Sequence, residues 1–141
     1  MTPIAQIRGF RNHNPGNIRH GAKWQGLAPE QTDPAFCTFV SPEYGIRAMG
    51  RILVNYKRHH GLNTPRGIVA RWAPPTENDT NAYTLHVCLQ VNAGPDDEID
   101  VENPDILEAL TAAIIRHECG INPYSRELIR RGVDLALEAS A

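Results

Sequence analysis

Hydrophobic residues in the C-terminal half of the chain recur at the three- and four-residue spacing of helices that bury one face. The clearest stripe joins Leu107, Leu110 and Ile114. Thr111 shares this stripe, where its methyl group can pack while its hydroxyl bonds to the preceding turn. One turn further on, the stripe reaches Glu118 instead of another aliphatic residue. The pattern therefore predicts a carboxylate at the C-terminal end of an otherwise apolar helix face.

Capping residues and helix breakers place this helix within a largely helical segment. Several expected helices begin with a capping side chain followed by proline, and glycine or proline is expected to stop most of them. The expected helices run from Ser41 to about His60, from Thr64 through Trp72, from Asp79 or Thr80 to Gly94, from Asn103 to Glu118, and onward from Ser125.

The first 35 or so residues contain so many prolines and glycines that no helix of normal length fits between them. Extended pieces at 17–19 and 35–40 are expected to pair as a small hairpin or ribbon. Aromatic and aliphatic residues in this segment indicate that it is packed, and a long packed loop is typically functional. The expected fold is mainly α (α+β), a single domain of residues 1–141 with a small irregular or β lobe (1–40) and a helical lobe (41–141).

The amino-acid composition and charge argue against several classes of function. A chain of 141 residues with 41% hydrophobic and 21% charged residues is ordinary for a soluble globular domain. The formal charge of -2 provides no basic field of the kind that indicates nucleic-acid binding. No signal peptide and no long apolar run are recognisable, so neither a leader nor membrane insertion is expected.

Cysteine and histidine spacing does not indicate a metal or redox site. The three cysteines are too few and too irregularly spaced for a disulfide framework or a zinc motif, and Cys37 and Cys88 are expected to be reduced core residues. Cys119 would need an activating base to act as a nucleophile. Ile121 stands where a second histidine would complete an H-E-x-x-H motif with His117. We therefore expect no metal and no cofactor.

Glu118 is the candidate catalytic acid. Desolvation on a half-buried apolar face raises the pKa of a carboxyl group, which gives the protonated state that a general acid needs near neutral pH. The alternative, a solvated glutamate at a helix end, remains open. Candidates for contacts to a polar ligand such as a sugar are Asn17, Arg19, Trp24, Asn78 and Tyr83. For Trp24 a core position is the alternative, and for the loop containing Asn78 a rigid surface turn.

The run AIIRHECGINPYS, residues 113–125, resembles the catalytic-glutamate segment of soluble lytic transglycosylases and goose-type lysozymes. Glu118 matches the single essential acid of that segment, whereas Cys119 replaces the usual serine and Ile121 the usual aromatic residue.

Two further segments, at 41–56 and 68–87, are similar to parts of the same superfamily. They follow the glutamate helix in the family but precede it here, so the chain resembles a circularly permuted lysozyme-like fold. Circular permutation is tolerated where chain termini lie close together. The whole chain is also similar to small phage virion-associated lysins.

The resemblance implies a muramidase that cuts the MurNAc–GlcNAc β-1,4 bond of peptidoglycan glycan strands, with protonated Glu118 as the acid. A lytic transglycosylase then uses the same carboxylate to form a 1,6-anhydro ring, whereas a lysozyme needs a second carboxylate. Asp33 is the candidate for this second group, ahead of Asp79 and Glu77. A turn residue before Pro34 is the alternative for Asp33.

Two other classes of function remain. One is a non-catalytic phage virion or tail component that binds cell wall, and the other is a regulatory helical domain, which the acidic charge balance disfavours. The resemblance also implies a monomer located in the phage virion or the host cytoplasm, acting on the periplasmic cell wall of the host.

Overall fold

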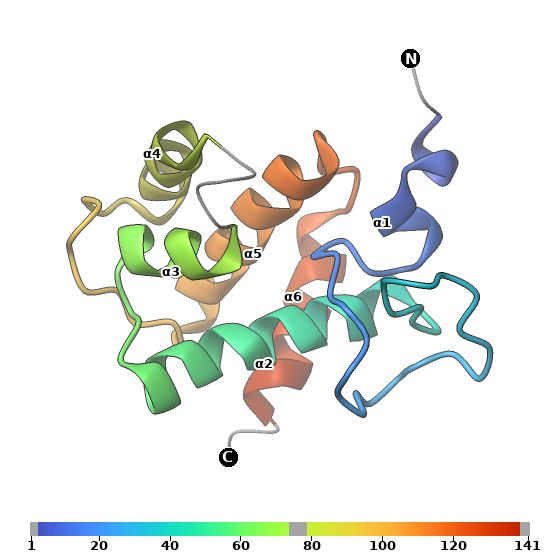
Figure 1. The fold of residues 1–141 in the computed structure, drawn as a ribbon. Coiled ribbons are helices and arrows are strands. Elements are labelled where there is room, and N and C mark those ends of the chain that lie inside the picture. The colour runs from blue at the N-terminus through green and yellow to red at the C-terminus, as the bar shows by residue number, and fades with distance from the viewer. Residues whose placement is uncertain (1–2, 74–78, 139–141) are drawn as a thin grey trace.

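The longest helix crosses the middle of the structure, and the remaining helices pack around it (Figure 1). The computed structural model describes residues 3–73 and 79–138, which are mainly helical, and this confirms the expected class. The elements in chain order are η1 (Ile4–Gln6), α1 (Arg8–Arg11), α2 (Pro42–His60), α3 (Pro65–Trp72), α4 (Thr80–Val91), α5 (Pro104–Cys119) and α6 (Arg126–Glu138).

Side-chain caps set most helix starts at the predicted places. Thr64 accepts a hydrogen bond from the Gly67 amide at 3.1 Å, and Asn103 accepts one from the Asp105 amide at 2.9 Å. These bonds satisfy amide groups that have no partner within their helices. Ser41 differs from the prediction, because its side chain makes no cap hydrogen bond and α2 starts on the proline alone.

The helix ends follow from left-handed backbone conformations. Gly61 and Gly120, with φ of 64° and 82°, end α2 and α5 as predicted. Helix α4 ends earlier than predicted, because Asn92 adopts the left-handed conformation (φ 57°) before Gly94 is reached. Asparagine tolerates this conformation better than most residues, which makes it the second commonest residue at this position.

Helices α2 and α6 cross at close range through two glycines. A Cβ atom on Gly132 would lie 2.6 Å from Ile46 Cβ, and one on Gly50 would lie 2.7 Å from Ala136 Cβ. Both distances are shorter than any ordinary contact between carbon atoms. The absence of side chains at Gly50 and Gly132 therefore sets the separation of the two helices.

The predicted stripe of α5 forms part of the hydrophobic core. Leu107, Leu110 and Ile114 are fully buried, and so is Thr111, whose hydroxyl donates to the Leu107 carbonyl at 2.8 Å. Core residues come from the N-terminal segment as well as from the helices, among them Phe10, Ile18, Cys37 and Phe39. The small lobe and the helical lobe thus share one core.

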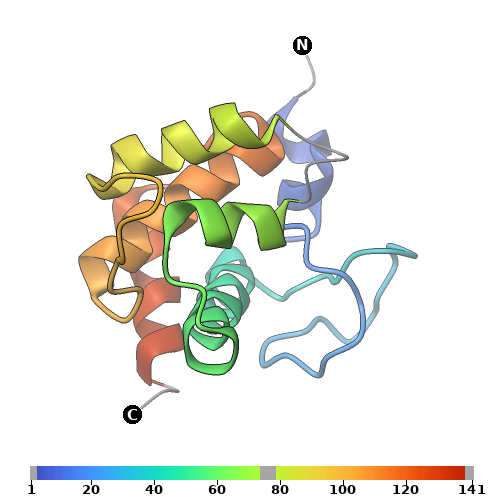
Figure 2. The same cartoon turned by 60° about the vertical axis from the view of Figure 1, so that its left-hand side comes forward.

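The segment between α1 and α2 is a long loop that lies beside the helices in both ribbon views (Figures 1 and 2). The predicted pairing is present as an isolated antiparallel bridge between Arg19 and Phe36, and a second, unpredicted bridge joins Leu27 to Phe39. The buried Asn14 side chain stabilises the first bridge region, since it donates to the carbonyls of Ile18 and Cys37 at 2.9 Å. Hydrogen bonds from side chains to the backbone therefore take the place of many backbone–backbone hydrogen bonds that a regular sheet would have here.

The first and last described residues lie at opposite ends of the molecule in both ribbon views (Figures 1 and 2). Within the described parts of the chain, no helix has the length and apolar character needed to cross a membrane.

Candidate active site

A cleft of about 330 Å³ opens between the long loop and helices α2, α3 and α5. The loop contributes one wall, α2 and α3 contribute aromatic residues, and α5 contributes its last turn. The described lining residues are Gly16, Asn17, Ile18, Arg19, Phe36, Ile52, Tyr56, Trp72 and Glu118.

Glu118 lies where the apolar stripe of α5 predicts it. The residue is half-buried in the last turn of the helix and lines the cleft. Among the described lining residues it is the one carboxylate. Ile114, one turn earlier, is completely buried, so the core ends and the cleft begins within a single helical turn.

Aromatic side chains from three elements form much of the cleft. Tyr56 and Trp72 meet edge to face with their ring centroids 6.3 Å apart, and Arg71 lies over the Tyr56 ring at 5.3 Å. Burial raises the pKa of Tyr56, so its hydroxyl remains a hydrogen-bond donor at neutral pH. Phe36 lines the cleft from the loop.

Tyr56 and Trp72 were not among the site residues predicted from the sequence. Each lies at the end of an inward-facing helical stripe, as Glu118 does. The position at which a stripe leaves the core is the sequence signal that identifies all three.

Two of the predicted ligand contacts, Asn17 and Arg19, line the cleft. Asn17 adopts a left-handed backbone conformation with φ of 51°, which turns the loop at the cleft wall. Arg19 is exposed, and its guanidinium lies over the Phe36 ring at 4.9 Å.

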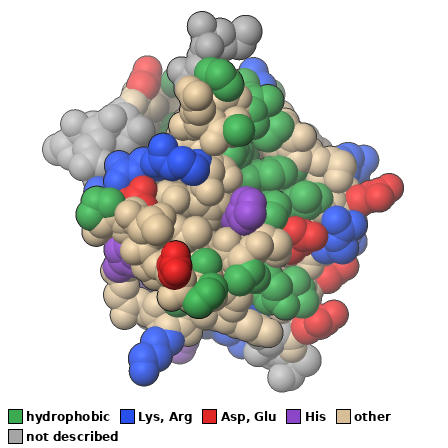
Figure 3. All heavy atoms as spheres, turned by 90° about the vertical axis from the view of Figure 1, so that its right-hand side faces the viewer, with side chains coloured by type: hydrophobic (Ala, Val, Ile, Leu, Met, Phe, Trp, Pro, Cys, Tyr) green, Lys and Arg blue, Asp and Glu red, His purple; other side chains and the backbone are tan. Residues whose placement is uncertain are grey.

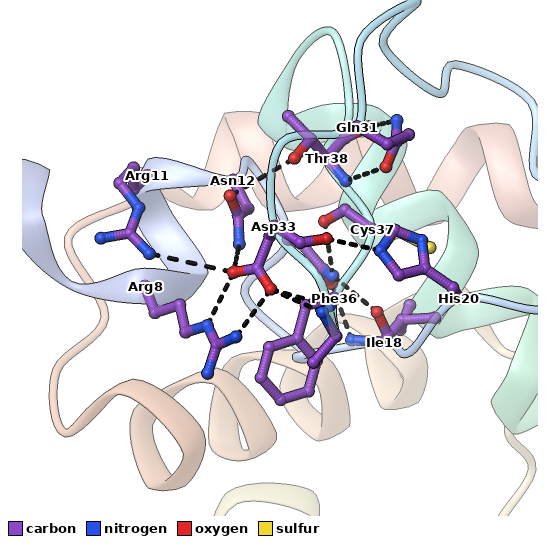
Figure 4. Close-up of polar contacts among 12 residues, drawn as sticks. Arg8, Arg11, Asn12, Ile18, His20, Gln31, Asp33, Phe36, Cys37 and Thr38 are labelled. Carbon is purple, nitrogen blue, oxygen red and sulfur yellow. Dashed lines mark hydrogen bonds and ion pairs between the residues drawn. The ribbon is translucent and has the colours of Figure 1, made fainter.

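Asp33 lies outside the lining of this cleft, in a buried network beside α1 (Figure 4). Both oxygens of its carboxylate accept hydrogen bonds from Arg8 at 2.6 Å. Further hydrogen bonds come from the Asn12 side chain at 3.0 Å and from the backbone amides of Ala35 and Phe36 at 2.9 and 3.0 Å. These bonds, led by those from Arg8, hold the pKa of Asp33 far below its ordinary value. Its contacts are those of a structural carboxylate that fixes a turn.

The other predicted contacts are not among the described lining residues. Trp24 is half-buried and packs against the core. Tyr83 is 2% exposed and stacks on His117 with ring centroids 4.2 Å apart, so that ring covers one of its faces. Asn78 and Glu77 fall outside the described residues. Asp79 caps α4 and accepts a hydrogen bond from the Ala82 amide at 3.1 Å.

The residues next to Glu118 do not provide a nucleophile or a metal site. The Cys119 thiol donates to the Pro15 carbonyl at 3.4 Å, and burial raises its pKa to about 12, the opposite of what an activated thiol requires. His117 lies 4.8 Å from the His86 ring, and burial lowers the pKa of both imidazoles. The described residues hold no cluster of three or more groups suited to bind a metal ion.

The fold and site define a mainly helical protein with an aromatic-lined cleft, a carboxylate from a helix end, and amide and guanidinium groups from a loop. No protein-family model matches the chain. The chain is 39% identical over 131 residues to Protein P5 of Pseudoalteromonas phage PM2, an alignment that covers 90% of this chain and 80% of the relative. The chain therefore belongs to the same family as this phage protein, which supports the expected link to bacteriophages.

Proposed function

We propose that the protein is a peptidoglycan-cleaving muramidase in which Glu118 protonates the glycosidic oxygen of a MurNAc–GlcNAc β-1,4 bond. The observation that carries the proposal is the position of Glu118, a half-buried carboxylate that lines a cleft together with Tyr56 and Trp72. Aromatic rings with polar partners are the usual surroundings of bound sugars, since a ring packs on the apolar face of a pyranose.

A general acid must carry its proton before it can donate it to the leaving group. Glu118 is half-buried and lies at the C-terminal end of α5, where the helix dipole presents its negative pole. Proton transfer to the leaving oxygen would stabilise the oxocarbenium-like transition state. The proton would then be recovered either from the muramyl C6 hydroxyl or from water.

The two routes differ in the carboxyl groups that they need. An inverting hydrolase holds its second carboxyl about 6.5–9.5 Å from the acid, and a retaining one about 5–5.5 Å away. Asp33, the predicted second carboxylate, lies outside this lining and is engaged in its buried network. The proposed function therefore covers both chemistries: a lytic transglycosylase would release 1,6-anhydromuramyl products, and a lysozyme would release reducing ends.

The test compares clearance of purified cell walls by the wild type and by Glu118→Gln. Removal of the acid should lower the rate by about 100-fold or more. Glu127→Gln, an exposed change of the same kind in the first turn of α6, should leave the rate unchanged. Circular dichroism should show that both variants remain folded.

Equal clearance by Glu118→Gln and wild type would exclude Glu118 as the acid. Mass spectrometry of the released muropeptides would distinguish the two chemistries, because anhydro ends indicate transglycosylation and reducing ends indicate hydrolysis. Binding to cell walls without release of any product would instead identify a non-catalytic cell-wall-binding component.

A further inference from the structure

Arg19 is the cation among the described lining residues of the cleft. Its side chain makes a cation–π contact with Phe36, and no ion pair joins it to any residue in the described parts of the chain. A guanidinium held over a ring by a cation–π contact can still donate hydrogen bonds from its N–H groups to a ligand.

The Phe36 residue that Arg19 contacts also interacts with Arg8 and Asp33. Arg8 lies over the same ring at 4.5 Å, and Asp33 holds Arg8 with two hydrogen bonds of 2.6 Å (Figure 4). Asp33 also accepts a hydrogen bond from the Phe36 amide, and Phe36 pairs with Arg19 through the antiparallel bridge. The buried network thus fixes the ring on which Arg19 lies, and less side-chain freedom is lost when Arg19 binds a ligand.

The charge around Arg19 is positive in a protein whose net charge is negative. Arg8 and Arg11 share the one carboxylate of Asp33, at 2.6 and 3.8 Å, whereas Arg19 has no such neutralising partner among the described residues. Figure 3 shows a short row of Lys and Arg side chains on one face of the molecule, and further basic and acidic side chains at separate places around it. This part of the cleft is suited to a negatively charged group.

We propose that Arg19 is a specificity-determining residue that binds the carboxylate carried by the C3 substituent of the muramyl sugar. This inference rests on the proposed function and names the part of the substrate that the cleft selects. Chitin and peptidoglycan share a β-1,4-linked N-acetylhexosamine backbone, but in peptidoglycan alternate sugars carry an acidic substituent. That carboxylate is the lactyl group itself in peptide-free strands, and it belongs to the stem peptide in intact strands. A guanidinium fork matches a carboxylate with two parallel hydrogen bonds.

The experiment measures binding by calorimetry in the Glu118→Gln background, which prevents turnover, with and without Arg19→Gln. The probes are peptide-free glycan tetrasaccharides prepared with an amidase, tetrasaccharides with intact stem peptides, and chitotetraose as the neutral control. Loss of Arg19 should weaken binding of a carboxylate-bearing probe about tenfold or more, the effect of one hydrogen-bonded charge. Affinity for chitotetraose should change less than about twofold.

Two further variants separate specific recognition from general electrostatics. Arg19→Lys keeps the charge but loses the fork, so it should restore only part of the affinity. Lys23→Gln removes a charge from an exposed position of the same loop outside the described cleft lining, and it should leave binding unchanged. If Arg19→Gln loses affinity only for peptide-free strands, the ligand of Arg19 is the lactyl carboxylate. If it loses affinity only for intact strands, the ligand is a carboxylate of the stem peptide.

The assignment of Arg19 would be overturned if Arg19→Gln weakened the binding of chitotetraose and of the charged probes equally, or if it changed the affinity for no probe. It would also be overturned if the Glu118→Gln parent did not bind the charged probes. The proposed function fails on a different readout, namely cell-wall clearance that survives Glu118→Gln. If charged strands bind in an Arg19-dependent way but are not cleaved, the assignment of Arg19 as an anion-binding residue stands and the proposed enzymatic activity is excluded.

Discussion

The two acidic residues Asp33 and Glu118 have different surroundings within one small domain. The Asp33 carboxylate accepts hydrogen bonds from two side chains and two backbone amides, which hold it ionised in a buried position. Glu118 lies at the rim of the core and lines an open cleft. The carboxylate that is enclosed by donors supports the fold, and the one at the cleft is the proposed general acid.

Asp33→Asn should lower the thermal midpoint of unfolding, because it leaves Arg8 without its bidentate partner beside the loop. Asp96→Asn is the matched control, since Asp96 makes a similar two-bond pair with Arg66 on the surface. Exposed pairs contribute at most about 1 kcal/mol, so the Asp96 variant should lose much less stability. Differential scanning calorimetry measures both midpoints, and equal losses would contradict a special role for the buried network.

At the scale of elements, the crossing of α2 and α6 determines how the helical part is assembled. Both helices have glycines at the contact, and a side chain at either position would meet atoms of the partner helix. In isolation, alanine would be the better helix former at these positions. Close approach of the two backbones therefore outweighs intrinsic helix propensity here.

Gly132→Ala should destabilise the protein by about 1–3 kcal/mol, the usual cost of overpacking, despite a gain in helix propensity of up to about 1 kcal/mol. Its new methyl group would meet Ile46 Cγ2 at 2.6 Å and the Glu43 carbonyl at 2.9 Å. Asp134→Ala, at an exposed position of the same helix, should change stability by less than about 0.5 kcal/mol. Urea unfolding curves measure both, and an increase in stability for Gly132→Ala would show that the helices can separate without cost.

At the scale of the whole molecule, stability should depend on pH in two separate ranges. Burial lowers the pKa of His86 and His117, so the unfolded chain binds more protons than the folded one below about pH 6.5. Asp33 has a lowered pKa because of its hydrogen bonds. Its stabilisation is present above about pH 4 and is lost as the pH falls further.

The double variant His86→Gln/His117→Gln should flatten the decline in stability between about pH 7 and 5, because it removes the two imidazoles that resist protonation in the folded state. His59→Gln, at an exposed position in α2, should leave the decline in place. The free energy of unfolding, measured with urea at several pH values, provides the comparison. An unchanged slope in the double variant would assign the pH dependence to other groups.

The amino-acid sequence by itself determined the helices, their caps and the end of the α5 stripe at Glu118. These features depend on residues three or four positions apart, so the spacing of apolar residues and the placement of Ser, Thr, Asn, Gly and Pro are sufficient. The pairing of Arg19 with Phe36 was likewise predictable from two short extended pieces.

Only the tertiary structure decided which polar residues share the cleft. Asp33 and Arg19 come from the same loop and were both candidates for the site, but Asp33 pairs with Arg8 in a buried network and Arg19 lines the cleft. Tyr56 and Trp72 pack against the core and also line the cleft with Glu118. These contacts join segments far apart in the chain, and the packing geometry that decides them does not appear in any local pattern of residues.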